Sequence, residues 1–191
     1  LFGFTNYDAV RYFEDVHITA QPHAEIPDMY YAAYRYVIAI DHFKNAAYLF
    51  EHNYNDEKSE LDSFEQLLFH KNIPAYQFNL VGSETSDCTD EEYIEMVNKG
   101  ILHCLRGDVF QIVLSRKFEQ EFSGDEFNVY RALRSINPSP YLFYFDYGSF
   151  KIFGSSPEAQ LIMKNGKAVI HPIAGTFKRT GNDESDAIAA Q

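Results

Sequence analysis

Three short segments combine residue types that could do chemistry with residues that fix the backbone. They are Asn137-Pro138-Ser139-Pro140-Tyr141, Gly154-Ser155-Ser156-Pro157-Glu158 and Pro172-Ile173-Ala174-Gly175-Thr176. The first is a rigid double-proline entry into an aromatic strand. The second places one carboxylate between a strand and a hairpin, and the third ends in a small residue, a glycine and a hydroxyl, where backbone can approach a ligand closely. Each segment alone is a weak indication, because most carboxylates at strand ends are simply solvated.

Several other kinds of site are disfavoured by the residue pattern. The seven histidines are scattered, and neither His-x-x-x-His nor Cys-x-x-Cys occurs, so the usual zinc spacings are missing. No glycine-rich phosphate loop is present. The serines of 155–156 lack the nucleophile-elbow pattern of a hydrolase.

Composition narrows the class of protein and its partners. The chain has 191 residues with 16 Lys and Arg against 28 Asp and Glu, a formal net charge of −12. That charge disfavours nucleic acid and anionic membranes as partners. Only two cysteines, Cys88 and Cys104, indicate a reduced, cytoplasmic compartment, and no apolar run is long enough to span a bilayer. Because the chain starts Leu-Phe-Gly without Met, we expect it to be a piece of a longer protein.

A β-hairpin, a loop and a linker are expected within the first 88 residues. Residues 30–40 are rich in aromatic and β-branched side chains, and a polar break at 42–45 separates them from an apolar run at 46–50. This pattern predicts a β-hairpin. Residues 51–63 are polar and charged and predict a loop, and the Gly, Ser and Thr residues of 81–88 predict a linker.

A helix and a strand are expected directly after the linker. Thr89 and Glu92 fit a capping box, in which each side chain satisfies the other's free amide. Apolar residues then recur at helical spacing up to Gly107, which predicts the end of the helix. The alternation over Val109–Phe118 predicts a strand.

The remainder is predicted to be one helix followed by hairpins. A second capping box at Ser123–Glu126 predicts a helix, which Asn137-Pro138 should end because a residue before proline leaves helical geometry. Strands at 141–147 and 150–154 are predicted to flank Gly148. Strands at 159–164 and 167–173 are predicted to flank Asn165-Gly166, a strong hairpin signal.

These elements predict an α+β fold in which an antiparallel β-sheet sandwich is flanked by helices. We expect residues 1–80 to form part of an N-terminal sandwich subdomain, 81–88 to be the linker, and 89–191 to be the first part of a catalytic domain.

The three opening segments, together and in this order, resemble the chorismate-utilising enzymes, most closely the large subunits (component I) of anthranilate synthases. The resemblance covers nearly the whole chain. It is carried by Asp8-Ala9-Val10-Arg11-Tyr12-Phe13-Glu14, Asp41-His42, Thr89-Asp90-Glu91-Glu92-Tyr93, Gly107-Asp108-Val109-Phe110-Gln111-Ile112-Val113-Leu114-Ser115-Arg116 and the three segments above. It implies that the second domain is a chorismate-binding catalytic domain.

Two positions indicate which reaction of that family is run. Members that form isochorismate or salicylate have a lysine at the place of Gln111 to activate water, and a neutral Gln cannot act as that base. One type of aminodeoxychorismate synthase has a nucleophilic lysine at the place of Ala174. Both differences favour a lyase that adds ammonia to chorismate and releases anthranilate and pyruvate. Because some aminodeoxychorismate synthases lack that lysine, 4-amino-4-deoxychorismate remains an alternative product.

The resemblance also implies roles for residues at the substrate. Glu158 matches the family acid that protonates the departing ring hydroxyl, a task that suits a carboxyl with a raised pKa. Gly175 and Thr176 match the pair that contacts chorismate, and Ala174 and Gln111 are expected beside them as substrate-binding residues.

A second set of residues matches the family's tryptophan feedback site. Pro140, Tyr141 and Leu142 follow the Asn-Pro-Ser motif, and many relatives have Met in place of Leu142, a change that keeps size and apolarity. The alternative interpretation of Pro140–Leu142 is simply the buried start of a strand.

The resemblance implies magnesium and a partner subunit. Chorismate is a dianion, and this acidic chain offers little to neutralise it. The glutamates that hold Mg²⁺ are expected C-terminal to Gln191, with no metal ligand among these residues. The expected partner is a glutamine amidotransferase subunit that supplies ammonia.

Three functions remain open at this point. The first is a fragment of an anthranilate synthase large subunit in tryptophan biosynthesis, inactive by itself. The second is component I of a 4-amino-4-deoxychorismate synthase in the folate pathway. The third is a non-catalytic module that binds tryptophan.

Overall fold

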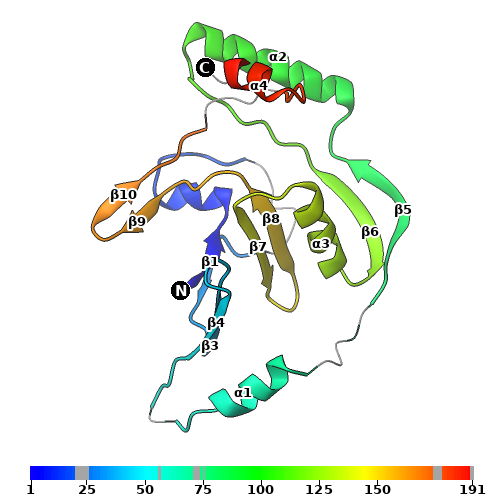
Figure 1. Cartoon of the computed structure of the whole chain (residues 1–191). Coiled ribbons are helices and arrows are strands. Elements are labelled where there is room, and N and C mark those ends of the chain that lie inside the picture. Colours follow the sequence, from blue (N-terminus) through cyan, green and yellow to red (C-terminus); the bar gives the residue numbers. More distant parts are fainter. Residues whose placement is uncertain (20–25, 56, 71–73, 75, 174–177, 190–191) are drawn as a thin grey trace. The chain divides into compact units, whose positions relative to one another are not determined.

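A computed structural model describes the chain except residues 20–25, 56, 71–73, 75, 174–177 and 190–191 (Figure 1). It divides into two units, Leu1–Pro74 with Tyr144–Phe153, and Ala75–Phe143 with Gly154–Gln191. The hairpin of β7 (Tyr141–Asp146) and β8 (Lys151–Ser156) contributes residues to both units. The chain reverses at Gly148, as predicted, and this glycine has φ 83°.

The first unit contains two antiparallel strand pairs, β1 with β2 and β3 with β4, together with two short helices. Its elements are β1 (Phe2–Thr5), the 3₁₀ helix η1 (Tyr7–Tyr12), β2 (Met29–Ala32), β3 (Tyr36–Asp41), β4 (Ala46–Glu51) and α1 (Leu61–Leu68). The hairpin predicted for residues 30–50 is confirmed over its second part as β3–β4, whereas the first residues of the predicted strand form the separate strand β2, which pairs with β1. The β3–β4 turn is held by Asp41 Oδ1, which accepts hydrogen bonds from the amides of Phe43 and Lys44 at 3.0 Å.

Aromatic rings provide much of the packing in the first unit. The Tyr147 ring lies 4.5 Å from Tyr30 and 5.7 Å from Phe4, measured between ring centroids, and Phe150 packs on both Phe4 and Tyr147. Burial among these rings raises the pKa of Tyr147. Its hydroxyl has no hydrogen-bond partner within the described part of the chain. The aromatic richness of the sequence therefore contributes to a partly buried cluster of rings in the first unit.

Helix α1 is not among the predicted elements, because its first turn falls inside the polar 51–63 segment for which composition predicts a loop. Phe64 stacks on Tyr36 with centroids 4.5 Å apart and an interplanar angle of 14°. The N-cap residue Glu60 makes no side-chain capping bond. The start of the helix is held by the Leu61 amide, which donates to Ser59 Oγ at 3.3 Å, and by the contact with the β3–β4 hairpin.

The second unit contains three more helices and two strand pairs of its own. Its elements are β5 (Phe78–Ser86), α2 (Asp90–Arg106), β6 (Phe118–Gly124), α3 (Phe127–Ile136), β9 (Ile162–Lys164), β10 (Lys167–Val169) and α4 (Asp183–Ala189). Helix α2 confirms both of its predicted ends. Thr89 and Glu92 form the capping box, and Gly107 ends the helix in the left-handed region at φ 80°.

Most of the expected linker at 81–88 is instead the second half of β5, which pairs with β6. The ladder is interrupted between Val81 and Thr85, where Gly82 has φ 70°. The Gly and Ser residues that indicated a linker are thus accommodated by a bulge within a strand. Gly124 is the last residue of β6. A Cβ at this position would lie 1.7 Å from the carbonyl oxygen of Gln77, so only glycine fits there.

The strand predicted at Val109–Phe118 is wrong for most of its length, because β6 begins only at Phe118. No described segment forms a ladder with residues 109–117. Ile112 and Leu114 lie against α2 instead, 3.4 Å and 3.7 Å from where a Cβ on Gly100 would be. The apolar alternation therefore reflects contact with a helix.

Arg116, near the end of the 109–117 segment, binds residues at the start of α2. Its guanidinium pairs with Asp90 at 2.6 Å, donates to the Cys88 carbonyl at 2.7 Å and to Ser86 Oγ at 2.8 Å, and lies over the Phe118 ring. One side chain thus fastens the end of β5, the first turn of α2 and the beginning of β6.

The second predicted capping box is wrong, although the helix it introduces is correct. Ser123 belongs to β6, where it pairs with Asn79, and the N-cap residue of α3 is Glu126, whose side chain makes no capping bond to the helix amides. Asp125 Oδ1 accepts from the Phe127 amide at 3.0 Å instead. The strand continues through Ser123, which leaves that residue unable to cap the helix.

The last hairpin is confirmed in a shorter form than predicted. β9 and β10 pair antiparallel around Asn165 and Gly166, which have φ of 51° and 72°. The fold is therefore a mixture of helices and small antiparallel strand pairs. The described residues form five two-stranded sheets, and the sandwich remains a prediction.

Candidate functional site

The Asn137–Tyr141 segment is shaped by its two prolines. Helix α3 ends at Ile136 and β7 begins at Tyr141, so the segment is a short connection between them. Pro140 and Tyr141 are exposed, and Leu142 is half-buried. The three residues expected to bind tryptophan therefore stand at the entry to a strand, with the aromatic ring 40% exposed.

The Gly154–Glu158 segment ends the neighbouring strand. Strand β8 stops at Ser156, and Pro157 has no amide with which to continue the ladder. Gly154 allows close packing against β7, since a Cβ there would lie 2.8 Å from Phe143 Cζ. Glu158 follows directly after Pro157, and its side chain is exposed.

Three serines join these two segments. Ser139 Oγ donates to the Ser156 carbonyl at 2.6 Å, and Ser155 Oγ donates to the Asn137 carbonyl at 2.5 Å. Ser156 Oγ also lies 3.3 Å from the Glu158 amide that donates to it. Sequence reasoning missed roles for these serines, because hydroxyls that bond carbonyls 17 and 18 residues away leave no local pattern.

The other predicted substrate residues are not brought to this place by any described contact. Gln111 lies in the exposed segment between α2 and β6, and no hydrogen bond within the described part of the chain links it to Glu158. Ala174, Gly175 and Thr176 lie outside the described residues. That these four residues lie beside Glu158 in the substrate site stays a prediction.

The apolar grooves lined by described residues include two that lie elsewhere. One, of about 440 Å³, lies between α2 and the 112–114 segment and is lined by Tyr93, Val97, Ile101, Cys104, Leu105, Ile112 and Leu114. The other, of about 390 Å³, lies between α1 and the β3–β4 hairpin. Neither groove is lined by a residue of the predicted site.

A metal site does not fit the described residues. Among them, no group of three or more His, Cys, Asp or Glu side chains could hold an ion. We therefore assign no step to a metal held by this part of the chain. The expectation that magnesium ligands lie beyond Gln191 stays a prediction.

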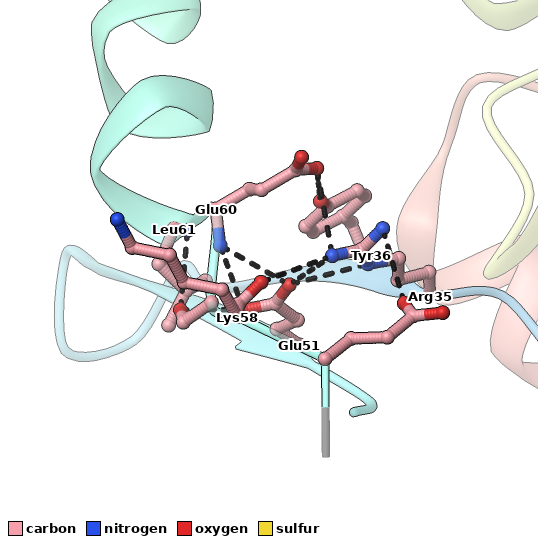
Figure 2. Close-up of polar contacts among 8 residues, drawn as sticks. Arg35, Tyr36, Glu51, Lys58, Glu60 and Leu61 are labelled. Carbon is pink, nitrogen blue, oxygen red and sulfur yellow. Dashed lines mark hydrogen bonds and ion pairs between the residues drawn. The ribbon is translucent and has the colours of Figure 1, made fainter. Parts of the chain in front are cut away.

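A polar cluster in the first unit lies around Glu51 and was not singled out by sequence (Figure 2). We call Arg35, Tyr36, Glu51, Ser59 and Glu60 the Glu51 cluster. The Glu51 carboxylate, 1% exposed, accepts from Ser59 Oγ at 2.6 Å, from the Glu60 amide at 3.3 Å, and from Arg35 Nη2 at 3.1 Å. These contacts hold the start of α1 against the end of β4.

The hydrogen bonds of the Glu51 cluster shift two pKa values. The bond from Ser59, followed by those from the Glu60 amide and Arg35, lowers the pKa of Glu51, although desolvation opposes it. Tyr36 donates to Glu60 Oε2 at 2.7 Å, and this bond raises the pKa of Tyr36 to about 12. Every contact of the cluster is local to the first unit, so we interpret it as structural.

Comparison with known proteins gives the class to which this chain belongs. The chorismate binding enzyme family matches residues 1–191. The chain belongs to this family of chorismate binding enzymes. It is similar to anthranilate synthase alpha subunit 1, chloroplastic, of Arabidopsis thaliana, with 36% identity over 96% of this chain and 35% of that protein. Anthranilate synthase component 1 of Acetivibrio thermocellus is 31% identical, over 96% of this chain and 41% of that protein.

A solved structure agrees with these sequences. The crystal structure of anthranilate synthase component I from Streptococcus pneumoniae TIGR4 matches 98% of this chain with a TM-score of 0.73 and 30% identity. The match covers 43% of that chain. This chain thus spans less than half the length of the relatives it matches.

Among the helices of the described part, none is both long and apolar enough to cross a membrane.

Proposed function

We propose that these residues are part of a longer anthranilate synthase large subunit, which converts chorismate and ammonia to anthranilate and pyruvate. The observation that carries the proposal is the continuous similarity, across 96–99% of this chain, to proteins named anthranilate synthase. Gln111 and Ala174 support it, because neither side chain offers the base or nucleophile of the sister reactions.

In this proposal Glu158 protonates the hydroxyl that leaves the chorismate ring as ammonia adds. A departing hydroxyl needs a proton in the transition state, and a carboxyl is a suitable donor. Glu158 is supported by its place: the backbone is held by Ser156, and the side chain is exposed at the end of β8.

The substrate contacts are proposed from the family pattern. Gly175 offers a backbone amide and Thr176 a hydroxyl to chorismate, with Ala174 and Gln111 beside them. A glutamine amidotransferase subunit supplies ammonia, and Mg²⁺ compensates the substrate's negative charge through ligands outside these residues. We propose the cytoplasm as location, whereas the name of the Arabidopsis relative includes the word chloroplastic.

Feedback inhibition by tryptophan is proposed at Pro140, Tyr141 and Leu142. The support is their position at the entry to β7, where Pro140 precedes the first two strand residues and Tyr141 is partly exposed. We also propose that the strand pairs of the described residues belong to an antiparallel sandwich completed by further residues of the longer chain.

The deciding experiment incubates the full-length enzyme with chorismate, Mg²⁺ and an ammonium salt and identifies the product by chromatography. Anthranilate is expected, and the 191-residue chain alone is expected to make none. A product of 4-amino-4-deoxychorismate would replace the proposal with the sister reaction. No turnover, together with a rise of the melting temperature in tryptophan, would favour a binding module.

A further inference from the structure

The connection before β7 is fastened to the end of β8 by side-chain hydroxyls. We call Ser139, Ser155 and Ser156 the serine cluster. Ser139 Oγ donates to the Ser156 carbonyl at 2.6 Å, while Ser155 Oγ donates to the Asn137 carbonyl at 2.5 Å. The two bonds run in opposite directions between the same two segments. They therefore fix the position of one segment relative to the other.

Ser156 also makes hydrogen bonds to the backbone of Glu158. Its Oγ accepts from the Glu158 amide at 3.3 Å and lies 3.1 Å from the Glu158 carbonyl, to which it donates. Pro157 between them has a restricted φ. The backbone of Glu158 is thus held on both sides of its Cα, at a point where β8 has already ended.

The Glu158 side chain is left available. It is exposed, and no hydrogen bond or ion pair to its carboxylate occurs among the described residues. A proton donor needs a fixed position and a free carboxyl oxygen, because a misplacement of about 1 Å can cost roughly 10²-fold in rate. Glu158 meets both requirements. Its backbone is held by hydrogen bonds to Ser156, and its carboxylate makes no hydrogen bond to the described residues.

We propose that Ser139 and Ser156 are positioning residues for Glu158. Ser156 holds the Glu158 backbone directly, and Ser139 holds Ser156 through its carbonyl oxygen. The inference rests on the proposed function, which gives Glu158 its role as proton donor. It adds two residues that do not touch the substrate and act through the acid.

The test uses the full-length enzyme with Ser139→Ala and, as matched control, Ser135→Ala. Ser135 Oγ also donates to a carbonyl, that of Arg131 at 3.1 Å, but this bond stays within α3. We expect Ser139→Ala to lower kcat about 10-fold with KM for chorismate nearly unchanged. Ser135→Ala should keep both constants, and Ser139→Thr should restore most of kcat because it retains the hydroxyl.

Two kinetic outcomes would overturn the proposal. One is a kcat for Ser139→Ala equal to that of Ser135→Ala. The other is a loss that Ser139→Thr does not rescue and that appears equally in kcat and KM, since this pattern indicates general disruption of the fold.

Hydrogen exchange separates this proposal from the proposed function, because it needs no turnover. In Ser139→Ala and in Ser156→Ala, the Glu158 amide is expected to exchange about five-fold faster than in Ser135→Ala, the effect of losing one hydrogen bond. Unchanged exchange overturns the positioning role even if the enzyme is active. Faster exchange in an enzyme that makes no anthranilate supports the positioning role and rejects the proposed function.

Discussion

Two glutamates at strand ends, one in each unit, are held in opposite ways. Glu51 is the last residue of β4, and its carboxylate is 1% exposed and surrounded by donors from Arg35, Ser59 and Glu60. Glu158 follows β8, and only its backbone is held, by Ser156. One residue is fixed through its carboxylate and the other through its main chain.

The contrast separates a structural carboxylate from one that is available for chemistry. Donors around Glu51 stabilise the ionised form and lower its pKa, which makes it a poor proton donor near neutral pH. The Glu158 side chain is exposed, as the proposed role of proton donor requires. The dense hydrogen bonding around Glu51 is therefore the sign of a structural role, whereas the carboxylate of Glu158 makes no hydrogen bond or ion pair among the described residues.

The largest expected effect would come from Glu158→Gln. In the full-length enzyme we expect kcat for anthranilate formation to fall about 10²-fold or more, because the amide cannot protonate the leaving hydroxyl. The melting temperature should stay close to that of the wild type. Glu84→Gln, an exposed glutamate of β5 in the same unit, is the control and should keep its kcat. An unchanged rate in Glu158→Gln would remove this residue from the mechanism.

Glu51→Gln should show the opposite profile. The uncharged amide keeps the size of the side chain but loses the ion pair with Arg35 and the acceptor for several donors. We expect a fall of about 5 °C in the melting temperature, measured by circular dichroism. Glu57→Gln removes only the 3.5 Å ion pair between Arg35 and a side chain that is 54% exposed. This control should lower the melting temperature far less. Equal shifts in both variants would contradict the special place of Glu51.

The contribution of Glu51 should also depend on pH in a defined direction. Its pKa in the folded state is lower than the ordinary value of 4.5. The stability it provides is therefore complete above about pH 4.5 and is lost as the pH falls through the folded-state pKa. The gap in melting temperature between wild type and Glu51→Gln should be constant from about pH 7 to pH 5 and narrow below pH 4.5. If the difference in melting temperature widened in acid instead, the pKa of Glu51 would be raised by folding rather than lowered.

The smallest effect is expected at the edge of the same cluster. The Tyr36 hydroxyl donates to Glu60, and its pKa is raised to about 12. Stability from this bond is present below the ordinary pKa of 10 and is lost as the pH rises toward 12. Tyr36→Phe keeps the stacking on Phe64, so its melting temperature should fall only slightly. An alkaline ultraviolet titration should show that the tyrosine missing from the variant is one that ionises near 12. If the missing group ionises near 10, the bond is not maintained in solution.

Local signals predicted the fold well wherever the cause was local. The capping box of Thr89 and Glu92, the αL end at Gly107 and the turn at Asn165-Gly166 depend on residues that are neighbours in sequence. The strand predicted over Val109–Phe118 failed because a strand needs a ladder partner, and alternation alone cannot say whether one exists.

For the candidate site, sequence supplied the residues but not their connections. Glu158 and Pro140–Leu142 were identified by family resemblance. The bond from Ser139 to the Ser156 carbonyl could not be predicted, because it depends on how β7 and β8 bring two loops together. The Glu51 cluster was missed for the same reason, since Ser59 and Glu60 reach Glu51 only when the chain after β4 turns back.

The pairing of strands in twos has a practical consequence for handling the protein. Every strand of the described part has a hydrogen-bonded partner on one side only, so each sheet presents two open edges. Such edges are templates on which another strand can add, either from the rest of a longer chain or from a second molecule. The net charge of −12 makes copies repel one another. Because salt screens that repulsion beyond about 8 Å at physiological ionic strength, the ionic strength of the buffer becomes a means of controlling self-association.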